Sequence, residues 1–92
     1  MHVNIKGNKW GVIFCPLKEI PTKVGETFLG LCDYENKTIF IADSTRGEEK
    51  LDTLTHEVLH ALDDKLGEKE VKYLSEGVAK VLWKLGYRRI EQ

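Results

Sequence analysis

The residues with the clearest chemical potential are two histidines and a glutamate just past the middle of the chain. His56, Glu57 and His60 form the pattern HExxH. On a helix, residues four positions apart project from the same face, so both imidazoles can reach one zinc ion. Glu57 is then placed to accept a proton from a water molecule that the zinc ion activates, without binding the ion itself. The motif therefore predicts a zinc site with Glu57 as general base and acid.

A zinc site of this kind needs a third protein ligand, and the spacing of the expected helices favours Glu76. If the first helix runs on to Gly67 and the chain then returns antiparallel, Glu76 comes back to the level of His60. Glu70 would still lie about 6 Å beyond that level at about 1.5 Å per residue, and it is the alternative ligand. We therefore expect His56, His60 and Glu76 to hold the ion.

The elements that must position these residues follow from periodicity and turn signals. The N-terminal half predicts a small, mostly antiparallel sheet, with a hairpin over 32–42 that turns at 35–37. Two helices should follow, from about 47 to 66 and from about 69 to 85, each ended by a glycine. The expected fold is α+β, a small mostly antiparallel N-terminal sheet packed on two C-terminal helices, in one domain over 1–92.

Helical phase predicts which faces are buried. At 100° per residue, one side of the first helix forms a core stripe with Leu59 at its edge, and both histidines lie on another side. The members of the stripe are Leu51, Leu54, Val58, Leu62 and Leu66. In the second helix, Ala79 and Trp83 share the side of Glu76, which should pack against the first helix. The main apolar stripe of the second helix consists of Val71, Leu74, Val78, Val81, Leu82 and Leu85.

Composition limits the partners. The chain has 14 Lys plus Arg and 15 Asp plus Glu, a formal net charge of −1, and no basic stripe, which argues against nucleic-acid binding. The apolar runs are too short to span a membrane, and the N-terminus lacks the apolar centre of a signal peptide. We therefore expect a cytoplasmic location, with Cys15 and Cys32 reduced.

The stretch 53–62, preceded by the strand at 38–42 and followed by a returning helix with a glutamate, resembles the small gluzincin-type zinc metallopeptidases. The resemblance covers about 30–85, and its specificity lies in HExxH. It implies zinc as cofactor, a peptide or protein substrate, His56, His60 and Glu76 as ligands, and Glu57 as the catalytic residue. It also implies that the strand is a sheet edge that binds an extended substrate by β-augmentation. The residues of that strand are Thr38, Ile39, Phe40, Ile41 and Ala42.

Alternatives to a peptidase follow from what the chain lacks. In contrast to larger gluzincins, we expect no substantial domain after the glutamate helix. No obvious histidine could polarise the scissile carbonyl, for which Tyr34, Tyr73 and Arg46 are candidates. The zinc site could instead belong to a regulatory or interaction module that binds a partner without cutting it. A further ligand, such as Cys15, could close the site and leave it latent or structural. An open water position favours the enzyme, and a fourth protein ligand favours latency.

Overall fold

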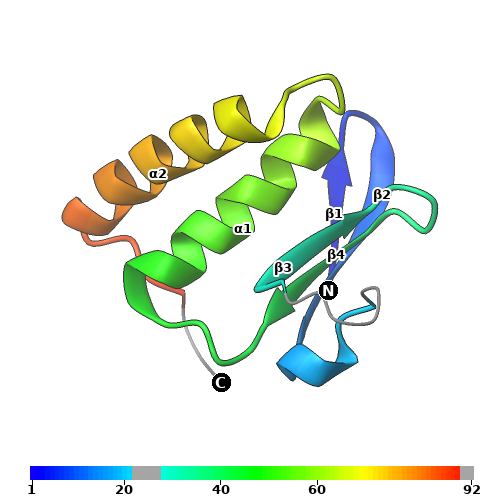
Figure 1. The fold of residues 1–92 in the computed structure, drawn as a ribbon, viewed down its shortest axis with the longest axis horizontal. Helices are drawn as coiled ribbons and strands as arrows, with labels where there is room; N and C mark the ends of the chain where they lie inside the picture. Colours follow the sequence, from blue (N-terminus) through cyan, green and yellow to red (C-terminus); the bar gives the residue numbers. More distant parts are fainter. Residues whose placement is uncertain (22–27, 90–92) are drawn as a thin grey trace.

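The computed structural model describes residues 1–21 and 28–89, and its architecture is α+β, as predicted (Figure 1). In chain order the elements are β1 (His2–Ile5), β2 (Asn8–Cys15), the 3₁₀ helix η1 (Leu17–Glu19), β3 (Gly30–Asp33), β4 (Thr38–Ala42), α1 (Gly47–Leu62) and α2 (Glu68–Lys84). Within the described ranges, every helix is too short or too polar to cross a membrane.

The four strands form one sheet in the order β1-β2-β4-β3. Both outer pairs are antiparallel, and the central pair, β2 with β4, is parallel. Lys6 and Gly7 join β1 to β2 with φ of 51° and 82°, the left-handed backbone that two-residue hairpin turns require. In the turn between β3 and β4, the backbone N–H of Asn36 donates to Asp33 Oδ1 at 3.2 Å. The predicted 32–42 hairpin is therefore confirmed.

The strand predicted to bind substrate does not lie at an edge of the sheet. The segment Thr38–Ala42 pairs on one side with β2 and on the other with β3, so ladder partners flank it on both sides and it cannot add a further strand. The prediction was wrong because β2 joins β4 from far away in the sequence, a pairing that local pattern does not reveal. The edge strand on this side of the sheet is β3.

One face of the sheet packs against α1 and forms the core. Its buried residues are Ile5, Trp10, Val12, Ile39 and Ile41, and Leu54, Val58 and Ala61 of α1 pack against them. The other main neighbour of α1 is α2, which lies on the side away from the sheet (Figure 1). The molecule is therefore layered as sheet, α1, α2, and two different sides of α1 are covered.

The first helix ends at Leu62, four residues before the predicted end at Leu66. Directly after it, the side chain of Asp63 accepts a hydrogen bond from the backbone N–H of Lys65 at 3.0 Å. Such a local bond stabilises a turn at the expense of helix, and negative charge is unfavourable at a helix C-terminus. The second helix then begins at Glu68, so the connection between the helices is a five-residue loop over 63–67.

The second helix uses a different face from the one predicted. Val71, Ser75 and Ala79 are fully buried, whereas most of the predicted apolar stripe is exposed. The exposed members are Leu74 at 40%, Val78 at 43%, Val81 at 58% and Leu85 at 69%. Small side chains on the buried face allow α2 to pack closely against α1. A prediction that selects the most hydrophobic face of the helix does not account for this close packing. Of the side expected to pack against α1, Ala79 is fully buried and Trp83 lies close to Gly47 of α1, whereas Glu76 is exposed.

Candidate metal centre

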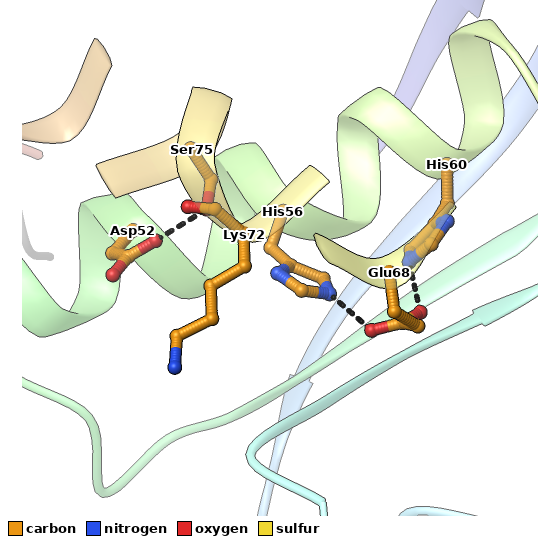
Figure 2. A network of polar contacts seen from close by, with 6 residues as sticks. All are labelled: Asp52, His56, His60, Glu68, Lys72 and Ser75. Carbon is orange, nitrogen blue, oxygen red and sulfur yellow. Dashed lines mark hydrogen bonds and ion pairs between the residues drawn. The ribbon is translucent and has the colours of Figure 1, made fainter. Parts of the chain in front are cut away.

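A polar contact between the two helices fixes their relative position. Ser75 of α2 donates a hydrogen bond from its hydroxyl to Asp52 Oδ1 of α1 at 2.7 Å. Because the helices are antiparallel, this contact sets the first turn of α2 opposite the second half of α1. Glu68, the first residue of α2, consequently points at His56 and His60 (Figure 2).

The three side chains converge on one point. Glu68 Oε2 lies 3.3 Å from His56 Nε2, and Glu68 Oε1 lies 2.7 Å from His60 Nε2. One nitrogen or oxygen from each residue lies within 4.8 Å of the other two. In a tetrahedral zinc site with bonds of 2.0 to 2.2 Å, ligand atoms are about 3.4 Å apart. The group therefore fits a zinc ion after small side-chain movements, and we call it the metal cluster.

The metal cluster is open on one side. The side chains of His56 and His60 are 24% and 13% exposed, so the histidines are not simply surface residues, whereas Glu68 is 76% exposed. A hollow of about 300 Å³ adjoins the cluster and is lined in part by Phe28, Leu31 and the cluster itself. A small acyl group or a peptide backbone can enter this hollow.

Glu57 lies beside the cluster but is not a member of it. It is 8% exposed and is the buried residue of α1. Burial, with a smaller effect from the negative charge of Glu68, raises the pKa of the Glu57 carboxyl to about 7. A carboxyl group with a pKa near neutrality can both accept and release a proton at physiological pH, as a general base and acid must.

Close approach of β3 to α1 places Glu57 at the edge of the sheet. A Cβ at Gly30 would lie 2.9 Å from Thr53 Cγ2 and 3.0 Å from Glu57 Cγ and Oε2. Only glycine fits this position without displacing its neighbours. The edge strand β3 therefore runs directly alongside the carboxyl group, and Gly30 lines the same hollow.

Three of the predicted site residues lie together in the structure, but the glutamate beside the two histidines is not the predicted one. His56, Glu57 and His60 lie together as expected, but the third member of the cluster is Glu68 rather than Glu76 or Glu70. The cause is the earlier end of α1, which brings the start of α2, not its middle, to the level of His60. Glu76 instead lines a neighbouring hollow on the Asp52 side of His56.

The remaining candidates separate in space. Tyr34 lines the hollow beside the cluster, whereas Tyr73 and Arg46 line hollows elsewhere, and Cys15 is not part of the cluster. Burial raises the pKa of Tyr34 to about 12, so its hydroxyl remains a hydrogen-bond donor at neutral pH. Burial and the charge of Glu57 likewise raise the pKa of Cys32 to about 12, which keeps this free thiol protonated.

Two imidazoles and one carboxylate form a donor set typical of catalytic zinc sites, in which three protein ligands leave a position for water. Among the described residues, the cluster contains no fourth ligand. Comparisons with known protein families, with curated proteins and with solved structures found no match. The chemistry of the site is therefore inferred from its own residues.

Proposed function

We propose that the protein is a zinc-dependent peptidase, with His56, His60 and Glu68 as metal ligands and Glu57 as general base and acid. The observation that carries this proposal is the convergence of three ligand atoms within 4.8 Å beside a buried carboxyl group. The donor set supports zinc, and the hollow beside it supports access by a substrate. Glu68 replaces Glu76 in this proposal because it is the glutamate that the fold brings to the histidines.

A bound zinc ion would lower the pKa of a water molecule and polarise the scissile carbonyl. Glu57 takes one proton from that water as its oxygen forms a bond to the carbonyl carbon. The same proton then passes to the amide nitrogen as the C–N bond breaks, so Glu57 returns to its carboxylate form. Tyr34 lines the same hollow, and in this proposal its hydroxyl is the hydrogen-bond donor to the carbonyl oxygen as negative charge develops.

The edge strand β3 supports recognition of an extended peptide. Its inner side pairs with β4, and no other strand of the described residues pairs with its outer side, where a peptide strand could be added. Gly30 brings this strand into contact with Glu57, so a peptide paired with β3 passes close to the metal cluster. The function that Thr38–Ala42 was expected to perform is therefore proposed for Gly30–Asp33.

Zinc-loaded protein incubated with a library of unstructured peptides tests this proposal, with cleavage read by mass spectrometry. We expect the native protein to cleave a subset of the peptides and Glu57→Gln to be at least about 100-fold slower with equal zinc content, since only the proton acceptor is lost. Equal cleavage by the variant would show that Glu57 is not the base. Zinc binding without cleavage of any peptide would favour a binding module instead.

A further inference from the structure

The side of α2 that points away from α1 is apolar and uncovered. Tyr73, Val81 and Leu85 are 79%, 58% and 69% exposed, and Leu74 and Val78 are 40% and 43% exposed. These five residues recur at helical spacing and define what we call the outer face. Because α2 is the outermost layer of the fold, this face is accessible to another molecule (Figure 1). A contiguous apolar surface of this kind marks an interaction site.

A glycine lies at the centre of the outer face. A Cβ at Gly77 would meet nothing within 4 Å, so packing within the chain does not require glycine there. Glycine weakens a helix interior, yet Gly77 occurs in the middle of α2. It lines a shallow hollow with Tyr73, Leu74, Val78 and Val81. A missing side chain at such a point lets a second helix approach closely.

Charged residues on either side of Gly77 indicate that the second helix is another copy of α2. Glu70 lies seven residues before Gly77 and Lys84 seven residues after it, all on one side of the helix. If two copies of α2 pack antiparallel around Gly77, Glu70 of each copy faces Lys84 of the other. A parallel pair would instead bring like charges together, which is unfavourable.

The exposed area also favours self-association. The five residues of the outer face expose on the order of 500 Å² per chain, which is most of the about 800 Å² per partner in a stable interface. We propose that the outer face is a homodimer interface, in which two copies of α2 pack antiparallel around a two-fold axis at Gly77. Glu68 lies on the opposite side of α2, so the dimer leaves the metal cluster accessible.

Sedimentation equilibrium of the full chain tests the dimer. We expect a mass of about 21 kDa, twice the 10.5 kDa of the chain, at about 100 µM protein. Val81→Glu should weaken association at least about 30-fold, because it places a charge in the apolar interface. Leu17→Glu is the matched control, since Leu17 is 40% exposed on η1 and lies outside the outer face. A monomer at 100 µM, or equal effects of the two variants, would overturn the proposal.

A charge exchange tests the antiparallel arrangement without altering the apolar residues. Glu70→Lys and Lys84→Glu should each weaken association about 10-fold, since each creates two like-charge contacts across the axis. The double variant should restore association to within about threefold of the native protein. Zinc content should be the same in all these proteins, so the result is independent of the metal cluster. Failure of the double variant to recover would contradict the antiparallel pairing.

Discussion

Glu57 combines burial with a position beside a cluster that can bind metal. The residue is 8% exposed and lies against Gly30, and burial and the charge of Glu68 raise the pKa of its carboxyl group to about 7. A buried carboxylate destabilises a fold unless a partner compensates for its desolvation. The fold tolerates Glu57 because the group can bind a proton at little cost near neutral pH, which is also the property that proton transfer requires.

This raised pKa predicts a pH dependence of stability in the metal-free protein. The folded state binds the Glu57 proton more tightly than the unfolded state, so the stabilisation is complete below about pH 4.5 and is lost as the pH rises through about 7. Glu57→Gln mimics the protonated form at every pH. The variant should therefore gain on the order of 2–3 kcal/mol relative to the native protein between pH 4.5 and 8. Urea unfolding with chelator present measures the difference.

The gain is a difference in the free energy of unfolding between two proteins that differ only at position 57. If the difference in the free energy of unfolding between Glu57→Gln and the native protein stays constant from pH 4.5 to 8, Glu57 is not held in the buried environment described above.

The glutamates of α2 provide a second prediction at the scale of single residues. Glu68→Ala should weaken zinc binding at least about 100-fold, because it removes one of three ligands. Glu76→Ala and Glu70→Ala are matched controls from the same helix, and each should remain within about threefold of the native affinity. Competition against a fluorescent zinc chelator gives all four constants. A large loss on replacing Glu76 would restore the ligand expected from sequence.

At the scale of elements, local patterns predicted what nearby residues determine. HExxH placed His56 and His60 on one face, and the β3–β4 hairpin followed from turn residues. In that turn, Asp33 accepts hydrogen bonds from the backbone and the side chain of Asn36. The pairing of β4 with β2 depends instead on two segments that are distant in the sequence. The position of α2 along α1 depends on where α1 ends and on the hydrogen bond between Ser75 and Asp52. Helical periodicity predicts neither of these features. Glu68 was missed for this reason, although Asp63 and Asp64 signalled the earlier helix end.

The contact between β3 and α1 predicts the effect of adding a single methyl group. Gly30→Ala should destabilise the protein by about 1–3 kcal/mol and reduce cleavage, because the new Cβ meets Thr53 and Glu57 at 2.9–3.0 Å. Gly11→Ala on β2 is the control, since its Cβ would meet its nearest neighbours at ordinary distances of 3.6–3.9 Å. Thermal and urea unfolding compare the two variants. Equal stabilities would show that β3 does not approach α1 as closely as described.

At the scale of the whole molecule, a small core makes ligand binding important for stability. Among the described residues, the core cluster contains five buried side chains, and the metal cluster joins α1 to α2. Zinc that binds only the folded state adds RT ln(1 + [Zn²⁺]/Kd) to the free energy of unfolding, about 4 kcal/mol at a concentration 1,000-fold above Kd. The binding energy should therefore stabilise the packing of α2 on α1.

Thermal unfolding with and without zinc measures this coupling. The native protein should unfold at a higher temperature in zinc than in chelator, by at least about 10 °C near saturation. His60→Ala should lose most of the increase, whereas Glu76→Ala should keep it. An unfolding temperature that does not respond to zinc in the native protein would show that the cluster does not bind the ion in the folded state.

A crystal structure of the zinc-soaked protein, with anomalous difference density measured above the zinc absorption edge, tests the central claim most directly. We predict a single strong peak at about 2.0–2.2 Å from the ring nitrogens of His56 and His60 and from a carboxylate oxygen of Glu68, with Glu57 unbound beside it. A peak that lacks either histidine, or one whose carboxylate ligand is Glu76, would contradict the site described above.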